Sequence, residues 1–86
     1  MTAPEFVVAI DTREQKPYRF PRCEVKTLPT GDYSIVGLED QIVIERKHKA
    51  DAYASLGQGR ARFERELARL AVFDYAAIVV ETTLPD

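Results

Sequence analysis

The chain has 86 residues, of which 45% are hydrophobic and 30% charged, and a formal net charge of −2, which is typical of a single small globular domain spanning 1–86. No apolar run is long enough to span a membrane, and the N-terminus lacks the charged and apolar regions of a signal peptide. The single cysteine, Cys23, excludes an internal disulfide and is expected to be a half-buried strand residue. These features fit an intracellular protein, cytoplasmic if bacterial or phage and nuclear if eukaryotic.

Four strands are predicted in the first half of the chain. Residues 6–10 form a continuous apolar run that ends at Asp11, which is typical of a central strand buried on both faces. After a loop that contains two prolines, residues 23–28 alternate loosely and predict a second strand. Residues 33–36 and 41–47, which a polar turn separates, predict the third and fourth strands.

Two helices and one strand are predicted in the second half. Residues 52–56 indicate a short helix with Asp51 as its N-cap, and a glycine-containing break follows at 57–59. Residues 60–73 predict the strongest helix, because apolar side chains recur there at the helical period. The apolar run 76–80 predicts a final strand. Together these elements predict an α/β or α+β layered domain.

Two carboxylates are predicted to meet between the third and fourth strands. Asp32 follows a Pro-Thr-Gly turn and opens the third strand. Side chains alternate along a strand, so Glu45 and Lys47 share one face of the fourth strand and Arg46 lies on the other. If the two strands pair, Asp32 meets Glu45 near the edge of the sheet. Taken alone, Glu-x-Lys also fits an exposed cross-strand ion pair.

This combination suits metal-dependent cleavage of a phosphodiester bond. Mg²⁺ prefers oxygen ligands and is usually held by one or two carboxylates plus phosphate oxygens, so Asp32 and Glu45 are candidate ligands. A metal-bound water is a better nucleophile because its pKa is lowered. Lys47 can orient that water or stabilise the charge that develops on the phosphate. The pattern therefore predicts a nuclease.

Asp11 and Glu14 extend the candidate site to the end of the first strand. Strand ends are where the sites of α/β proteins collect, so we expect both acids to belong to the site. The alternative is that they are a strand-end cap and a loop acid.

The basic residues are concentrated after the fourth strand. Residues 46–70 carry seven basic and three acidic residues, a local charge of +4 that fits contact with a phosphate backbone. On the long helix, Arg62, Arg65 and Arg69 share the face opposite the apolar stripe, where DNA contact and a solvated face fit equally well. Arg60 lies nearer the apolar stripe and is expected to point back toward the sheet and the metal site.

Several motifs resemble, in the same order, those of the nuclease domain of the XPF/Hef family of structure-specific endonucleases. The hallmark of that family is Gly-Asp, a variable gap, Glu-Arg-Lys, three residues and Asp. Its first strand typically ends in Asp-x-Arg-Glu, and a serine and a Gly-Arg pair follow the hallmark. The matching residues here are Gly31-Asp32, Glu45-Arg46-Lys47, Asp51, Asp11-Thr12-Arg13-Glu14, Ser55 and Gly59-Arg60.

The resemblance implies a restriction-endonuclease-like α/β core, with a central mixed β-sheet flanked by helices. It also implies an endonuclease that depends on Mg²⁺ or Mn²⁺ and cuts branched DNA such as flaps or forks. Lys47 would position the attacking water, and Arg60 would hold the phosphate. The Arg46 main-chain carbonyl would add a metal ligand, while its side chain is expected to have a structural role. The implied residues are Asp32, Glu45 and Asp11 for the metal, these with Lys47 and Glu14 for catalysis, and Arg60, Asp51, Arg46 and Arg62 on the substrate side.

The resemblance further implies a homodimer or a heterodimer with a related subunit. The family's nuclease domain usually continues past the last strand into more strand and helix, and often joins a helix-hairpin-helix module. This chain shows neither, so we expect a fragment or a minimal relative. Two other functions stay open. One is a catalytically silent DNA-binding or dimerisation module, which typically loses motif residues that this chain keeps. The other is a small protein-interaction domain, whose stability would not respond to metal.

Overall fold

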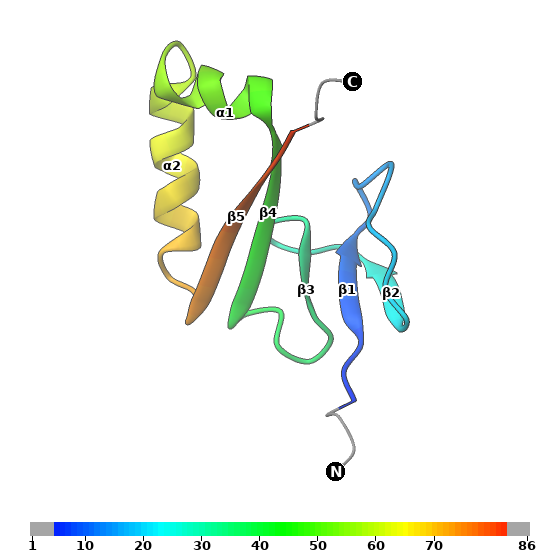
Figure 1. Cartoon of the computed structure of the whole chain (residues 1–86). Helices are drawn as coiled ribbons and strands as arrows, with labels where there is room; N and C mark the ends of the chain where they lie inside the picture. The colour runs from blue at the N-terminus through cyan, green and yellow to red at the C-terminus, as the bar shows by residue number, and fades with distance from the viewer. Residues whose placement is uncertain (1–4, 83–86) are drawn as a thin grey trace.

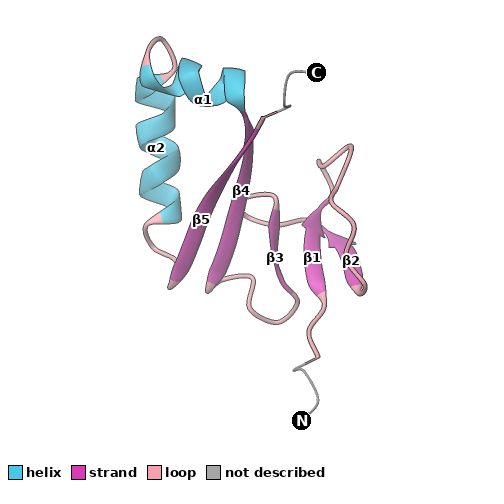
Figure 2. Cartoon of the chain, in the orientation of Figure 1, coloured by secondary structure: helices cyan, strands magenta, loops and turns pink. Residues whose placement is uncertain are grey.

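A computed structural model describes residues 5–82, so the ends of the expected domain, 1–4 and 83–86, lie outside the described residues. The chain folds into a mixed five-stranded sheet in the order β2-β1-β3-β4-β5, with both helices gathered at the β4–β5 end (Figures 1 and 2). The sheet with flanking helices confirms the predicted α/β class. The elements are β1 Val8–Asp11, β2 Cys23–Lys26, β3 Tyr33–Ile35, β4 Ile42–His48, α1 Lys49–Leu56, α2 Arg60–Leu70 and β5 Tyr75–Glu81.

The third and fourth strands pair, which is the condition on which the expected meeting of Asp32 and Glu45 depends. β3 pairs with β4 antiparallel, with Tyr33 opposite Ile44, while β1 pairs with β2 parallel and with β3 antiparallel. β4 and β5 are parallel and pair along their whole length. All four residues of β1 are buried, as expected for a central strand with a continuous apolar run. This arrangement places the end of β1, the start of β3 and the end of β4 close to one another.

The core lies between β1, β3 and the loop that precedes β2. Val8, Ile10 and Tyr33 form its buried cluster, and Phe20 packs against them with its ring edge toward Tyr33. In β4, Val43 is 1% exposed and is among the largest fully buried side chains of the described chain. Burial of these apolar side chains supplies the main driving force for folding in so small a domain.

The turn before β3 depends on Gly31. Its φ is +82°, in the left-handed region that side chains with a Cβ avoid. A Cβ at this position would meet Val43 Cγ2 at 2.2 Å and the Ile44 carbonyl oxygen at 3.2 Å. The next residue, Asp32, donates its main-chain N–H to Ile44 O at 2.9 Å and accepts from Asp11 N at 2.9 Å. Gly31 thus allows the turn to press against β4 and fixes Asp32 between β1 and β4.

The first helix begins earlier than predicted. α1 starts at Lys49, directly after β4, and His48 takes the N-cap position with an extended backbone. Asp51 is therefore not the N-cap but a residue of the first turn, and no side chain caps this helix. A carboxylate in the first turn is still favourable, because it faces the positive end of the helix dipole. α2 begins at Arg60 as predicted and ends at Leu70, before the expected limit of 73.

The outer strands are more exposed than the central ones. Tyr75, Val79 and Val80 of β5 are exposed, and β5 has a neighbour on one side only within the described sheet. An apolar groove runs between α2 and β5 and is lined by Leu67, Leu70, Ala71, Ala76, Ala77 and Ile78. In β2, Cys23 is exposed, which corrects its expected half-burial. Among the described residues, the helices are too short or too polar to cross a membrane.

Candidate active site

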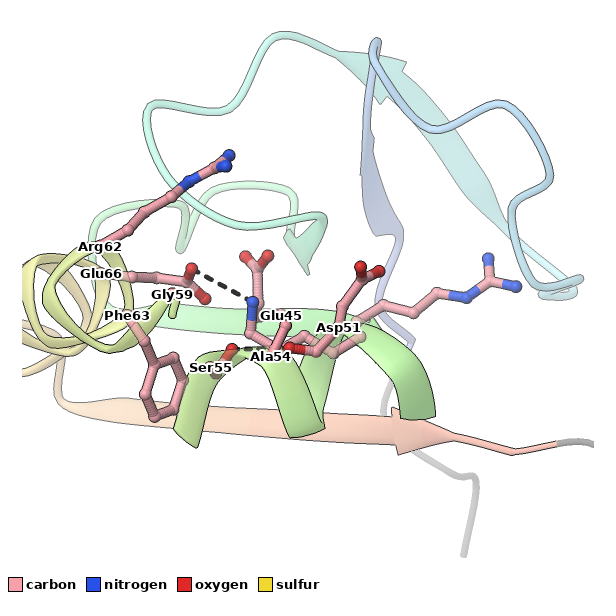
Figure 3. A pocket seen from close by; sticks show the side chains of 10 residues that line it. Glu45, Asp51, Ala54, Ser55, Gly59, Arg62, Phe63 and Glu66 are labelled. Atoms are coloured by element: carbon pink, nitrogen blue, oxygen red, sulfur yellow. Dashed lines mark hydrogen bonds and ion pairs between the residues drawn. The ribbon is translucent and has the colours of Figure 1, made fainter. Parts of the chain in front are cut away.

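Two adjoining cavities, of about 330 and 290 Å³, lie between the end of β4, the turn before β3 and helix α2. We call them together the β4–α2 cleft. Glu45, Arg62 and Glu66 line both cavities. Figure 3 shows Glu45 and Glu66 entering the cleft from β4 and α2, with Asp51 of α1 beside them. The other lining residues are Arg46, Lys47, Asp51, Ala54, Ser55, Gly59 and Phe63 in the first cavity, and Arg13, Pro29, Thr30, Gly31, Asp32 and Arg69 in the second.

Asp32 is held against the end of β4. Its Oδ2 accepts a hydrogen bond from the Arg46 main-chain N–H at 2.8 Å. Burial raises the pKa of Asp32, and the nearby carboxylates of Glu14 and Asp11 raise it further, although the Arg46 N–H opposes them. Desolvation and neighbouring negative charges both disfavour the ionised form of Asp32. A cation bound beside Asp32 would stabilise that ionised form.

Glu45 shares this environment. Burial raises the pKa of Glu45 to about 7, and the charges of Asp32 and Glu66 add to the shift, in that order. Asp32 and Glu45 also line the same cavity. The expectation that strand pairing brings these two carboxylates together is therefore confirmed.

The donors in the cleft fit a hydrated divalent cation. Mg²⁺ or Mn²⁺ would relieve the repulsion between Asp32 and Glu45, and Mg²⁺ commonly uses only one or two protein carboxylates. Within residues 5–82, no three His, Cys, Asp or Glu side chains are grouped closely enough to hold a metal ion. Asp32 and Glu45, which line the same cavity, are the carboxylates that could hold such an ion.

Asp11, at the end of β1, is joined to Asp32 by a main-chain hydrogen bond. The side-chain oxygens of Asp11 accept hydrogen bonds from other residues of the protein. Its Oδ1 accepts from Leu28 N at 2.8 Å, and its Oδ2 accepts from Arg13 Nε at 2.6 Å and from Arg13 N at 3.2 Å. Burial acts to raise the pKa of Asp11, but the hydrogen bonds from Arg13 and Leu28 outweigh it and lower the value. In this geometry Asp11 anchors the loop after β1. Its role as a metal ligand stays a prediction.

Lys47 lies on the same side of β4 as Glu45, as the strand alternation predicts. Its Nζ forms an ion pair with Glu66 Oε2 at 3.3 Å, drawn as a dashed line to Glu66 in Figure 3. Both side chains are only 14% exposed. Lys47 Nζ also lies 5.6 Å from the centre of the Phe63 ring. An otherwise flexible lysine is thus held inside the cleft by two residues of α2.

Arg46 lies on the opposite face and is engaged within the protein. Its Nε donates to Glu81 Oε2 at 2.7 Å, and its Nη1 donates to Glu14 Oε2 at 3.1 Å. Its guanidinium also lies 4.2 Å from the centre of the Tyr18 ring. This network ties β5 and the loop after β1 to β4, which favours the structural role expected for the Arg46 side chain. Glu14 belongs to this network and acts on Asp32 through space only.

The structure places the arginines of α2 differently from the prediction. Arg60 pairs with Glu64 at 3.1 Å, is 74% exposed and faces a separate depression with Leu56 and Leu67. Its expected orientation toward the metal site is therefore not observed. Arg62, which is also predicted on the substrate side, lines both cavities of the cleft. The reason is geometric, since two residues along a helix turn the side chain by about 200°.

Comparison with known proteins decides the family. The family model described as the ERCC4 domain matches residues 10–85. This chain belongs to the ERCC4 domain family. Among solved structures, XPF from Aeropyrum pernix matches with 32% sequence identity and a TM-score of 0.68, over 92% of this chain and 39% of that chain. No curated protein gives a significant match. The resemblance to XPF-type nuclease domains is thus confirmed, and this chain spans well under half of that XPF structure.

One residue of this ERCC4 domain was missed by the sequence reasoning. Glu66 lies in both cavities and binds Lys47, yet the motifs of the resemblance do not include it. A signal was present, because Arg62, Glu66 and Arg69 recur at i, i+4 and i+7 and so share one face of α2. The positive charge of that face favours DNA contact, and the pattern alone does not show that the carboxylate within it binds Lys47.

The raised pKa of Glu45 predicts how the stability of the ERCC4 domain depends on pH. Between pH 4.5 and about 7 the folded chain keeps a proton on Glu45 that the unfolded chain releases, so stability falls as pH rises through this window. Glu45→Gln removes the penalty and should raise the free energy of unfolding by about 1–3 kcal/mol at pH 8, with little effect at pH 4.

Thermal melting of metal-free protein across this pH range checks the Glu45 prediction. Glu64→Gln is the matched control, because Glu64 pairs with Arg60 at the surface, outside the cleft. An equal gain from Glu45→Gln at pH 4 and pH 8 would show that removal of the charge is not its cause.

Proposed function

We propose that this ERCC4 domain is a metal-dependent endodeoxyribonuclease that hydrolyses phosphodiester bonds in branched DNA. The observation that carries the proposal is the meeting of Asp32, Glu45 and Lys47 in one cleft of an XPF-type fold. Two carboxylates that repel each other and a lysine beside them are the residues that metal-assisted phosphodiester cleavage needs. Membership of the ERCC4 family supports the same class of reaction.

Each residue of the cleft has a distinct role in the proposal. Asp32 and Glu45 would hold Mg²⁺ or Mn²⁺, which when bound activates water and offsets the charge of the phosphate. Lys47 directs its ammonium into the space beside Glu45, where it stabilises negative charge on the phosphate oxygens and orients the attacking water. Burial of Glu45 and Lys47 limits solvent screening, so these charges act more strongly than they would at the surface.

Arginines on the two walls of the cleft supply the proposed contact with DNA. Arg62 and Arg69 project from α2, and Arg13 lines the opposite wall beside Asp32. Guanidinium groups bind phosphate oxygens in a bidentate manner, and contacts with the backbone give affinity without sequence preference. Of the two α2 arginines predicted on the substrate side, Arg62 lines the cleft and would bind the phosphate, while Arg60 faces away from it.

The remaining partners are proposed on the same basis. We expect a homodimer or a heterodimer with a related subunit, and the exposed apolar side chains of β5 support an interface there. The apolar groove between α2 and β5 continues that surface. Sedimentation at tens of micromolar checks this, since a monomer at every concentration would argue against self-association.

We also propose that the protein is intracellular, because the reducing conditions inside a cell would keep the single exposed cysteine, Cys23, in its thiol form.

Cleavage of labelled DNA tests the proposed function. Duplex, single-stranded, flap and fork DNA are incubated with the protein in Mg²⁺, in Mn²⁺ and in EDTA. We expect metal-dependent cutting of the branched substrates, reduced about 10²- to 10³-fold by Lys47→Ala because one stabiliser of the developing charge is lost.

Two outcomes would argue against a nuclease. Equal cutting by wild type and Lys47→Ala would exclude the proposed site. DNA binding without cleavage in either metal would instead identify a catalytically silent module of the same fold. A matched control for general loss of positive charge is Lys49→Ala, because Lys49 lies near the Tyr53 ring of α1 and does not line the cleft.

A further inference from the structure

We propose that Glu66 is a positioning residue that holds the Lys47 ammonium in its working place in the cleft. The inference rests on the proposed nuclease function and adds to it a residue from α2, outside the Gly-Asp and Glu-Arg-Lys motifs. By binding Lys47, Glu66 also prevents a direct ion pair between Lys47 and Glu45. Such a pair would occupy Glu45, a proposed metal ligand.

The first support is the geometry of the ion pair. Glu66 Oε2 lies 3.3 Å from Lys47 Nζ, and each side chain is only 14% exposed. A lysine carries a flexible four-carbon stem, so an unheld ammonium would sample many positions. Here Phe63, one turn before Glu66 on α2, lies within 5.6 Å of the ammonium on another side. The helix therefore supplies both contacts that restrict Lys47.

The second support is the unused hydrogen-bonding capacity of Glu66. Its Oε1 is buried and has no hydrogen-bond partner within the described chain. Buried carboxylate oxygens normally find partners, and an exception calls for an explanation at that site. Glu66 lines both cavities, so its carboxylate is directed at the cleft and not at bulk water. A carboxylate present only to neutralise a surface lysine would have both oxygens in water.

The third support is the arrangement of charges along the cleft. Lys47 interacts with carboxylates on both sides, Glu66 on α2 and Glu45 two residues earlier on β4. The hydrogen bond goes to Glu66 and not to Glu45. If Glu66 is removed, Glu45 remains as a carboxylate that attracts Lys47 in the same cavity. The ammonium would then compete with a cation for Glu45, and both proposed roles would suffer together.

The proposal makes a kinetic prediction for three variants. Glu66→Ala should lower kcat about 10- to 100-fold, as expected for loss of a residue that orients an active group, with KM for DNA within about threefold. Glu66→Gln keeps an acceptor for Lys47 and should restore most of kcat. In the Lys47→Ala background, the further change Glu66→Ala should cost less than about threefold, because residues that act through one another are not additive.

A spectroscopic measurement on the metal-free protein tests the positioning directly. The Lys47 ammonium and its adjacent carbon are observed by NMR with labelled lysine and assigned with Lys47→Arg. We expect the Lys47 signals to move in Glu66→Ala and to stay near their wild-type positions in Glu66→Gln. Glu64→Ala is the control, since Glu64 lies two residues earlier on α2 and pairs with exposed Arg60. Unmoved Lys47 signals in Glu66→Ala would overturn the proposal.

The two measurements separate this inference from the proposed function. Losses for Lys47→Ala and Glu66→Ala that multiply in the double variant would mean that Glu66 acts independently, which contradicts the proposal. If wild type cleaves no DNA, the nuclease function fails, and the NMR comparison alone then decides whether Glu66 holds Lys47. Melting curves of each variant confirm that it is folded before either comparison is made.

Discussion

Replacing Asp32 with alanine is expected to reduce DNA cleavage more than about 10³-fold and to remove the response of the protein to metal. Asp32 and Glu45 are the two carboxylates proposed to hold a divalent cation, and they line the same cavity, so Asp32→Ala removes one of the proposed metal ligands. A bound metal contributes several kcal/mol to a transition state of this kind, and each 1.4 kcal/mol corresponds to about tenfold in rate.

Metal binding is measured for Asp32→Ala separately from cleavage. A ligand at 100 times its Kd stabilises the folded state by about 2.7 kcal/mol, which for a domain of this size corresponds to a rise in Tm of roughly 10–20 °C. We expect this rise with Mn²⁺ in wild type and almost none in Asp32→Ala. A chelator should return wild type to its metal-free Tm.

Two further variants keep the Asp32 comparison interpretable. Asp32→Asn retains an acceptor for the Arg46 main-chain N–H while it removes the charge, so it separates loss of metal from loss of the hydrogen bond. Asp40→Ala is the control for removal of an aspartate, because Asp40 is exposed in the turn before β4. A Tm that rises equally with Mn²⁺ in wild type and Asp32→Asn would place the metal elsewhere. A wild-type Tm that does not respond to Mn²⁺ would favour a protein-interaction domain.

Gly31→Ala is expected to be the most destabilising of the four possible glycine-to-alanine changes in the chain. A left-handed backbone with a Cβ costs roughly 1–2 kcal/mol, and overpacking of a buried side chain adds about 1–3 kcal/mol. Both costs apply here, because the new Cβ would meet Val43 at 2.2 Å and Val43 is buried. We expect a loss of about 2–5 kcal/mol in the free energy of unfolding.

The matched control for Gly31→Ala is Gly37→Ala. Gly37 also has a positive φ, +92°, but a Cβ there would meet nothing within 4 Å. It should therefore show only the backbone cost of roughly 1–2 kcal/mol. Urea unfolding of both variants measures the difference. Equal losses would mean that the contact of Gly31 with β4 does not limit the turn.

Gly31→Ala should also disturb the cleft of any protein that remains folded. The clash pushes the turn away from β4, and Asp32 is displaced with it because it directly follows Gly31. Its hydrogen bond to Ile44 O of β4 is then weakened. The Mn²⁺ response should weaken in Gly31→Ala and remain in Gly37→Ala. The glycine of the Gly-Asp motif thus has a structural role, because it permits the tight turn that lets Asp32 approach Glu45.

The strands and their faces could be predicted from local pattern. Alternation along β4 correctly separated Glu45 and Lys47 from Arg46, because side chains of an extended backbone must alternate. The continuous apolar run before Asp11 correctly indicated a strand buried on both faces. Pairing of the third and fourth strands was a condition that the sequence left open, and the structure meets it and brings Asp32 to Glu45.

The helices show where local pattern was insufficient. α1 starts at Lys49 because the chain passes from β4 into the helix without a loop. Contacts of α1 with α2, β4 and β5 stabilise this arrangement, and the local sequence does not reveal them. The 3.6-residue period predicts which residues of α2 share a face, but it does not predict which part of the protein each face contacts. Whether Arg60 or Arg62 reaches the carboxylates depends on how α2 is rotated against the sheet, which its own sequence does not set.

The sequence by itself determined the class of fold, the family and the pair Asp32 and Glu45 with Lys47 beside them. These follow from local features of the sequence. Side chains alternate along a strand, a glycine permits a tight turn, and the motifs occur in the same order as in the family. Only the tertiary structure decided that Glu66 holds Lys47, that Arg46 joins Glu14 to Glu81, and that the oxygens of Asp11 are bonded within the protein. Those contacts link residues far apart in the chain, and their formation depends on how α2 and the loop after β1 pack against one sheet.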